Sequence, residues 1–356
     1  MKLEERPELG RLTTFESNRN IPVYRWLWYK EAFSRSLAMS LLDELDVDGP
    51  VLDPFCGSGT TLLCCKERSL PSYGTDVNPI ALTAARAKTT DYDMQRLADE
   101  ISAVFSHRYA PQQRALPDDA MAVKHLFARD TLERVLFFRT LASTAFHKDF
   151  FLLALANAAY ECSKVIRDGA VLRPGKKQFI PLAAVFKRNV KSMERDLKKA
   201  KLPSMACKVF EGDARKSPLA SRSVSAVVTS PPYLGIDDYT KAYAIENFAV
   251  GGSLKVWIGD GATPTEKINT YFSDMAAVLH ELKRACRPGS QIALVMWDGF
   301  VGGEIVDTCE AMAKLAPAAG LGAEKAWIVN RKPALKGRTE KVGELRESII
   351  FLEAPR

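Results

Sequence analysis

The chain has 356 residues, of which 47% are hydrophobic and 26% are charged, and its formal net charge is +7. These proportions are ordinary for a globular protein, and the length predicts one large or two modest domains. No run approaches the roughly 18 uninterrupted apolar residues of a membrane-spanning helix, and the polar first 20 residues lack the apolar segment of a secretory signal. We therefore expect a cytoplasmic protein with no membrane partner.

The cysteines and histidines predict no metal. Seven cysteines are present, an odd number, and they form no C-x-x-C pair, which argues against both a disulfide framework and a zinc site. The four histidines are scattered along the chain.

The first part of the chain alternates strands and helices after an N-terminal arm. Residues 1–20 are expected to form a flexible arm, and residues 23–45 carry apolar side chains at helical spacing. Residues 50–69 predict a strand, a glycine-rich turn and a helix, and residues 72–90 predict a strand and a helix with Pro79 near its start. Two such units in succession predict a parallel, doubly wound sheet.

The alternation stops after residue 90 and resumes near residue 203. Every apolar pattern in between is helical, so residues 91–202 are predicted to be a helical insertion, and residues 1–90 and 203–356 a single α/β domain. In the second part we expect strands at 207–214, 224–233, 291–299, 324–330 and 347–354, helices at 271–290 and 304–317, and a basic loop at 331–341.

The sequence DPFCGSGTT at residues 53–61 joins the first strand to its helix. Glycines there permit a tight turn and a close approach of a ligand to the backbone. A P-loop would need a lysine after the glycines, and a dinucleotide-binding turn would need a third glycine where Leu62 stands. Asp76, at the end of the next strand, is placed to accept hydrogen bonds from ribose hydroxyls. S-adenosylmethionine, which has a ribose and no pyrophosphate, fits this pattern; a structural turn without a ligand is the alternative.

The sequence TSPPYLG at residues 229–235 directly follows a buried apolar strand. Two consecutive prolines fix two φ angles and remove two donors, so a rigid segment with free carbonyl acceptors leaves the strand. With Ser230 and Tyr233, this segment is suited to hold a flat ring that carries an amino group. A proline turn with a packing tyrosine is the structural alternative.

These two motifs in this order resemble the amino-group DNA methyltransferases, which methylate the exocyclic nitrogen of cytosine or adenine. The resemblance extends to YKEAFS at residues 29–34 and GDA at residues 212–214, and it covers about residues 20–90 and 205–353. It implies a Rossmann-like methyltransferase sheet, S-adenosylmethionine as cofactor and double-stranded DNA as partner. A cognate restriction endonuclease is the second partner that the family suggests.

The resemblance also assigns the site. The residues implied for cofactor binding are Lys30, Phe33, Ser34, Asp53, Phe55, Cys56, Gly57, Ser58, Gly59, Thr60, Asp76, Val77, Asp213 and Ala214. The catalytic segment is Ser230, Pro231, Pro232 and Tyr233. An amine on an aromatic ring is a poor nucleophile because its lone pair is delocalised. Oxygen acceptors from Ser230 and the Pro231 carbonyl would bind the amine hydrogens, and Tyr233 would stack on a base flipped out of the duplex.

The identity of the methylated base is predicted from Ser230. In the family, serine at this position is found mostly in enzymes that methylate N4 of cytosine, and Asp or Asn mostly in enzymes that methylate N6 of adenine. Methylation of carbon 5 is not expected, since it needs a cysteine nucleophile and no Pro-Cys dipeptide is present. N6-adenine methylation is the first alternative and RNA guanine methylation the second. A non-catalytic DNA-binding subunit is the alternative from another class, although it would be expected to lose part of these motifs.

Basic residues suggest where DNA would bind. From Lys164 to Lys201 there are twelve Lys or Arg against three Asp or Glu. This stretch fits a phosphate backbone, with a solvated helix face as the alternative. With the basic loop it supplies the candidate DNA contacts Lys176, Lys177, Lys187, Arg188, Lys191, Arg331, Lys332, Lys336 and Arg338. Asp237, Asp238 and Tyr239, in the loop 234–270, are candidates for holding the flipped base, with a solvated turn as the equal alternative.

Overall fold

The computed structural model describes residues 1–111, 115–168, 171–175, 180–235, 239–253, 258–336 and 339–355. The main sheet consists of β1 (Lys2–Glu5), β2 (Val51–Asp53), β3 (Ser72–Asp76), β6 (Cys207–Glu211), β7 (Val224–Thr229), β8 (Cys286–Trp297), β11 (Gly322–Lys336) and β12 (Glu340–Glu353). Two small hairpins stand apart from it: β4 (Val165–Asp168) with β5 (Val171–Pro174), and β9 (Gly299–Val301) with β10 (Glu304–Val306).

The helices are α1 (Arg35–Glu44), α2 (Thr60–Glu67), α3 (Pro79–Thr89), α4 (Met94–Ser106), α5 (Asp118–Val123), α6 (Arg129–Thr144), α7 (Lys148–Glu161), α8 (Leu182–Ala200), α9 (Tyr239–Ala242), α10 (Ala244–Val250), α11 (Pro264–Ala285) and α12 (Thr308–Leu315). Short 3-10 helices lie at Pro7–Leu12, Phe15–Asn20, Tyr24–Trp26, Lys124–Leu126 and Ala316–Ala319. In the described part of the chain, no helix is long and apolar enough to cross a membrane.

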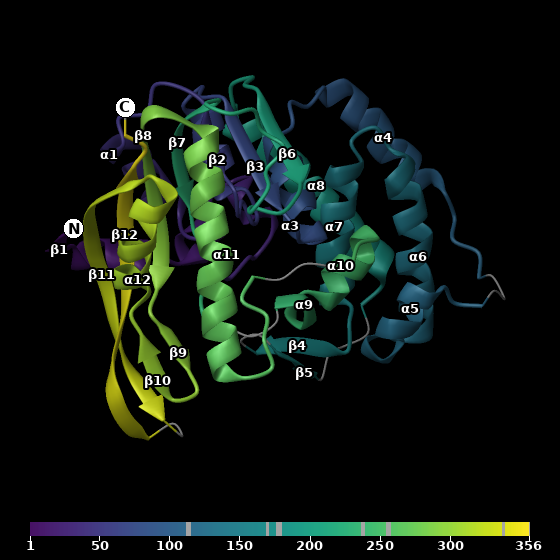
Figure 1. The fold of residues 1–356 in the computed structure, drawn as a ribbon. Coiled ribbons are helices and arrows are strands. Elements are labelled where there is room, and N and C mark those ends of the chain that lie inside the picture. Colours follow the sequence, from purple (N-terminus) through teal and green to yellow (C-terminus); the bar gives the residue numbers. More distant parts are fainter. Residues whose placement is uncertain are drawn as a thin grey trace.

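The sheet order is β1-β11-β12-β8-β7-β2-β3-β6 (Figure 1). Strands β6, β3, β2, β7 and β8 run parallel, and β12 is antiparallel to both of its neighbours. From the central β2 the chain builds outward through β3 to β6, and then returns to β7 on the other side of β2. This confirms the predicted doubly wound α/β fold. The carboxyl ends of β2 and β7 therefore form the crevice where ligands bind in such sheets.

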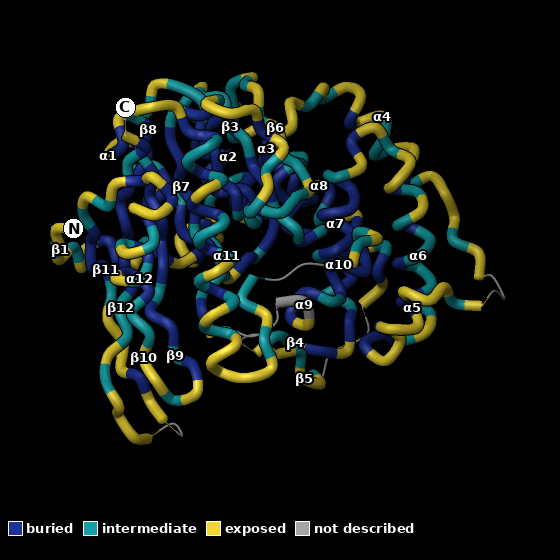
Figure 2. The backbone as a smooth tube through the Cα atoms, viewed as in Figure 1, coloured by how far each residue is buried: buried dark blue, intermediate teal, exposed yellow. Residues whose placement is uncertain are grey.

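The predicted insertion contains helices α4 to α8, but it is not entirely helical. The hairpin β4–β5 was not expected, because strands of four residues are too short to show a clear alternation. Helix α7 is buried around most of its circumference, as its sequence FFLLALANAAY requires. Its side chains belong to the same hydrophobic core as α1 and α3, so the insertion packs directly on one face of the sheet domain. Figure 2 shows this continuous buried region.

The N-terminal arm is ordered, which corrects the expectation of flexibility. Strand β1 pairs in parallel with β11, and Asn18 is buried. The Asn18 side chain donates to the carbonyl of Phe33 (3.2 Å) and accepts from the backbone of Arg35 (2.8 Å). The helix expected over residues 23–45 begins only at Arg35, where Ser34 is the N-cap and its hydroxyl accepts from Leu37 N.

The C-terminal part differs from expectation in several places. The expected loop 234–270 contains α9, α10 and the start of α11, and α11 ends at Ala285 instead of residue 290, where β8 already begins at Cys286. Residues 331–336 and 340–341 of the expected basic loop 331–341 are instead paired strands at the outer end of the β11–β12 hairpin. Pairing between the two strands overrides the weak strand propensity of this charged segment, which contains Pro333. The expected helix at 304–317 is shorter, because Glu304–Val306 forms β10 and Asp307 caps α12 by accepting from Glu310 N.

Candidate active site

A pocket lies at the carboxyl ends of β2, β3, β6 and β7. Its lining residues come from the segments 29–33, 53–61, 76–78, 212–214 and 230–233, together with Ile258. The structure thus brings the glycine turn, the acid after β3 and the Ser-Pro-Pro-Tyr segment into one cavity. Of the predicted cofactor residues, Lys30, Ser34, Ser58 and Gly59 are absent from this lining.

Asp53 connects the two motifs. Its carboxylate is buried and accepts a hydrogen bond from the Thr229 hydroxyl (2.6 Å) and another from the Phe55 backbone (3.2 Å). Burial raises the pKa of the Asp53 carboxyl to about 6, and the hydrogen bonds from Thr229 oppose this shift. The end of β2 is therefore fixed to the residue that precedes Ser230.

The glycine turn depends on Asp76. Its carboxylate accepts from the backbone of Gly57 (2.8 Å) and of Asn78 (2.8 Å), and burial raises its pKa. Gly57 and Gly59 both have positive φ angles, +47° and +82°. A Cβ atom on Gly59 would lie 2.9 Å from the Cα of Ala85, so this glycine lets α2 pack closely against α3.

Two buried polar atoms in the pocket lack a hydrogen-bond partner within the described structure. They are the Thr60 hydroxyl and the Asn78 side-chain oxygen, and both residues line the pocket. Buried polar groups are normally paired, so these two oxygens are exceptions within the described structure. The Asp76 carboxylate suits a cofactor that carries ribose hydroxyls.

The catalytic segment is held from two sides. The Ser230 hydroxyl donates to the Tyr233 hydroxyl oxygen (3.1 Å), and Tyr271 on α11 donates to the Pro232 carbonyl (3.0 Å). Burial raises the pKa of Tyr233 above its ordinary value, so the phenol stays protonated. Because Tyr271 binds the Pro232 carbonyl, the Pro231 carbonyl is the better placed of the two to accept from a ligand.

The sequence of the chain is similar to those of known proteins. No protein-family model matches the chain. The Type II methyltransferase M.BsoBI of Geobacillus stearothermophilus is 22% identical, over 97% of this chain and 88% of that relative. The Type II methyltransferase M.AvaI of Nostoc sp. is 23% identical, over 68% of this chain and 56% of that relative. This chain is a relative of the Type II methyltransferases. The predicted resemblance to amino-group methyltransferases is thereby confirmed, and the cofactor is S-adenosylmethionine.

A solved SAM-dependent methyltransferase from Methanosarcina mazei covers 88% of this chain and 96% of its own, with 10% identity and a TM-score of 0.35.

Sequence reasoning missed eight lining residues of this methyltransferase, among them Tyr29 and Glu31. Tyr29 stacks on Tyr243 with ring centroids 5.0 Å apart, and the Tyr243 hydroxyl donates to Glu31 (2.6 Å). Arg167, from the insertion, lies 4.4 Å from the Tyr243 ring centroid. Tyr29 and Glu31 belong to the YKEAFS motif, which was the sequence pattern that could have identified them. Of the three residues of that motif that were predicted to bind the cofactor, Phe33 lines the pocket, whereas Lys30 is exposed and Ser34 caps α1.

Asp213 lines the pocket beside Ala214, but its carboxylate is also engaged elsewhere. It forms an ion pair with Arg215 (2.6 Å), and Arg215 pairs with Asp274 on α11 as well (2.6 Å). The Arg215 guanidinium offsets burial and lowers the pKa of Asp213. Asp213 is therefore ionised near neutral pH.

The predicted DNA contacts lie outside the pocket of the methyltransferase. Lys187, Arg188 and Lys191 are exposed on α8, where Arg188 pairs with Glu161. Lys332 and Lys336 are exposed on β11, and Arg331 pairs with Glu5 and Glu344. Several residues predicted at the sequence level lie outside the described residues: Lys176, Lys177, Asp237, Asp238, Arg338 and the side chain of Tyr239.

Proposed function

We propose that this methyltransferase transfers a methyl group from S-adenosylmethionine to the exocyclic N4 of a cytosine flipped out of double-stranded DNA. The observation that carries the proposal is the shared pocket of the glycine turn and the Ser-Pro-Pro-Tyr segment, joined by the hydrogen bond between Asp53 and Thr229. The Type II relatives support DNA as the substrate.

In this proposal the cofactor lies along the ends of β2, β3 and β6. Asp76 would accept from the ribose hydroxyls, while Asp213 and Ala214 would lie beside the adenine. Glu31 and Phe33 would line the methionine end. When bound, S-adenosylmethionine supplies an electrophilic methyl group on a sulfonium that leaves as a neutral thioether.

The catalytic segment would act on the amine of the base. Ser230 and the Pro231 carbonyl would accept its two hydrogens, which localises the lone pair on the nitrogen. Tyr233 would stack on the flipped ring, since a base must leave the duplex to be reached. A nitrogen–carbon bond forms as the carbon–sulfur bond breaks, and the amine then releases one proton to solvent water. These residues contribute mainly by positioning and electrostatics.

N6-adenine methylation is the second candidate, because the relatives' names do not distinguish the two bases. Ser230 is the residue that favours cytosine. A restriction endonuclease that reads the same sequence is the protein partner implied by this function, and co-purification with the product of a neighbouring gene would test it.

The proposed substrate is tested with labelled S-adenosylmethionine. The purified protein is incubated with unmethylated duplex DNA, with single-stranded DNA and with RNA, and incorporation of label is counted. We expect labelling of duplex DNA above both other substrates. Labelling of RNA alone would overturn the proposal.

A further inference from the structure

The β11–β12 hairpin continues beyond the sheet. The last residue of β8 that pairs with β12 is Trp297, opposite Glu347, whereas β11 and β12 go on pairing to Lys336 and Glu340. We call residues 331–336 and 340–346 the arm. Six strand residues span about 20 Å. Figure 1 shows the arm extending past the body of the molecule beside the β9–β10 hairpin.

The arm leaves the sheet at the same edge as the pocket. Strand β11 runs in the same direction as β7 and β2, because β12 is antiparallel to β11 and to β8, and β8 is parallel to β7. The outer end of β11 and the catalytic segment after Thr229 therefore lie at the same edge. Strand β12 is two strands from β7, a separation of about 10 Å. A duplex placed with a base in the pocket would meet the arm.

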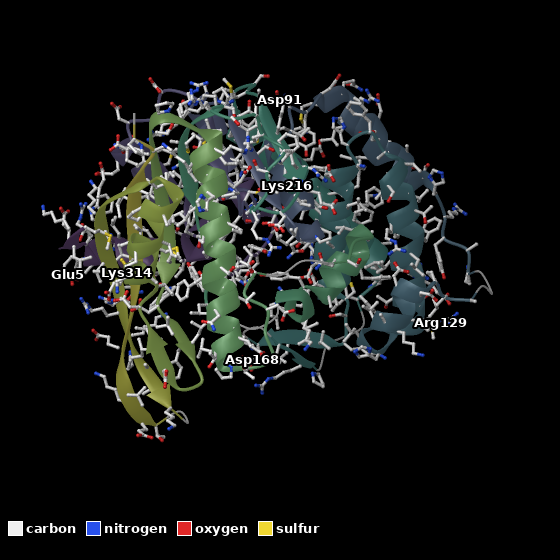
Figure 3. All side chains as sticks on the ribbon, in the orientation of Figure 1. Glu5, Asp91, Arg129, Asp168, Lys216 and Lys314 are labelled. Carbon is white, nitrogen blue, oxygen red and sulfur yellow. The ribbon has the colours of Figure 1, made fainter. Side chains whose placement is uncertain are left out.

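The base of the arm is fixed by ion pairs. The Arg346 backbone N–H donates to the Asp298 carboxylate (2.9 Å). The Arg346 guanidinium donates to Asp298 (3.2 Å) and to Asp307. On the other strand, Arg331 pairs with Glu344 and with Glu5 of β1, which Figure 3 labels. Both arginines thus pair with the protein's own carboxylates.

The outer half of the arm has a different surface. Its lysines, Lys336 and Lys341, are exposed, and residues 335–342 carry three Lys or Arg against one Glu. Leu335 and Val342 are also solvent-exposed, at 41% and 40% of their surface. Exposed apolar side chains beside lysines on a projecting ribbon can take part in a contact with another molecule.

We propose that the arm enters the major groove of double-stranded DNA and is the element that reads its sequence. This proposal rests on the proposed function. The major groove admits a two-stranded β-ribbon. Lys336 and Lys341 would contact phosphates, which gives affinity without sequence information. Leu335 and Val342 would contact base edges, where apolar groups recognise the thymine methyl.

Two double variants and a control separate these roles. Lys336→Ala with Lys341→Ala removes the outer charges, and Leu335→Ala with Val342→Ala removes the apolar pair. Lys2→Ala with Leu3→Ala is the control, since both residues are exposed on β1 in the same sheet and far from the outer end of the arm. Affinity for duplex DNA is measured against salt, and preferred sites are read by sequencing a methylated random-sequence duplex pool.

We expect the lysine variant to reduce the slope of log affinity against log salt by about 0.9 per contact, with unchanged site preference. The apolar variant should keep the slope and lose about tenfold or more of the preference for the target sequence. The control should match the wild type. Unchanged slope and preference in both arm variants would overturn the proposal, as would a site preference that changes on substitution of Lys187 and Lys191 instead.

The outcome also separates the arm from the proposed function. A wild-type protein that methylates DNA with arm variants unchanged would leave the function standing and refute the arm. A wild-type protein that binds duplex DNA through the arm but does not methylate it would leave the arm standing and refute the proposed function. A wild-type protein that neither binds nor methylates duplex DNA would refute both.

Discussion

The Thr229 hydroxyl donates a 2.6 Å hydrogen bond to the buried carboxylate of Asp53. Thr229 ends β7 immediately before Ser230, and Asp53 ends β2 immediately before the glycine turn. One bond therefore sets the position of the proposed base-binding segment relative to the proposed cofactor-binding turn. Neighbouring strand ends in a doubly wound sheet are the natural place for such a link.

Thr229→Val is expected to weaken both stability and activity. The valine has a similar shape but cannot donate, so the buried Asp53 carboxylate loses its shortest hydrogen bond. We expect the free energy of unfolding to fall by about 1–3 kcal/mol, as measured by urea denaturation above pH 7. Methyl transfer should fall as well. Thr229→Ser keeps the hydroxyl and should retain most of both; equal loss in the two variants would show that the bond is unimportant.

Asp76→Ala is expected to weaken binding of S-adenosylmethionine by about 1–3 kcal/mol, measured by calorimetry. The substitution removes the proposed acceptor for the ribose and also the two hydrogen bonds that hold Gly57 and Asn78. Thermal unfolding of the same sample shows whether the variant is folded. Unchanged affinity in a folded variant would remove Asp76 from the cofactor site.

Two buried lysines should respond in opposite directions to replacement by methionine. Lys88 is 1% exposed and its amine has no hydrogen-bond partner in the described structure, whereas Lys66 is 2% exposed and donates to Thr89 O and Asp91. Lys88→Met should raise the free energy of unfolding by about 1–3 kcal/mol at pH 7, because it removes an uncompensated polar group. Lys66→Met should lower it, since it leaves the partners of the amine unpaired.

The pH dependence of stability provides a second test of Lys88. Burial lowers the pKa of its amine to about 7, against 10.5 in the unfolded chain. The unfolded state therefore binds more protons between pH 7 and 10.5, and the contribution of Lys88 to stability rises with pH in that window. The difference between Lys88→Met and the wild type should shrink from pH 7 to pH 10. A constant difference would show that Lys88 is already charged when buried.

Much of the sheet and pocket could be predicted because the responsible residues act locally. Gly57, Gly59 and the two prolines after Ser230 impose backbone conformations within a few residues. Strand pairing at the chain ends could not be predicted in this way. The arm forms because β11 and β12 pair with each other, and β1 is ordered by β11, more than 300 residues away in sequence. Glu31 was missed because its partner Tyr243 is 212 residues away in sequence.

Glu347→Gln is expected to stabilise the protein at alkaline pH. Burial raises the pKa of the Glu347 carboxyl to about 7, from an ordinary value of 4.5, and the Thr13 hydroxyl donates to it (2.8 Å). Between pH 4.5 and 7, Glu347 binds more protons in the native state than in the unfolded state. The contribution of Glu347 to the free energy of unfolding therefore falls as pH rises through that window. The amide keeps an acceptor for Thr13 without the charge. At pH 8 the free energy of unfolding of Glu347→Gln should exceed that of the wild type by about 1–3 kcal/mol, and at pH 4 the two should be about equal. An equal difference at both pH values would exclude titration of Glu347.

The most direct test of the proposed chemistry is mass spectrometry of nucleosides from duplex DNA methylated by the wild type and by Ser230→Ala and Tyr233→Ala. The proposed function predicts N4-methylcytosine from the wild type. Both variants should form far less of it while binding S-adenosylmethionine normally, because neither side chain is assigned to the ribose, and a lost stacking surface costs about 1–3 kcal/mol. N6-methyladenine would show that the base is wrong and the amino-group chemistry right. A wild-type product of 5-methylcytosine would contradict the central claim.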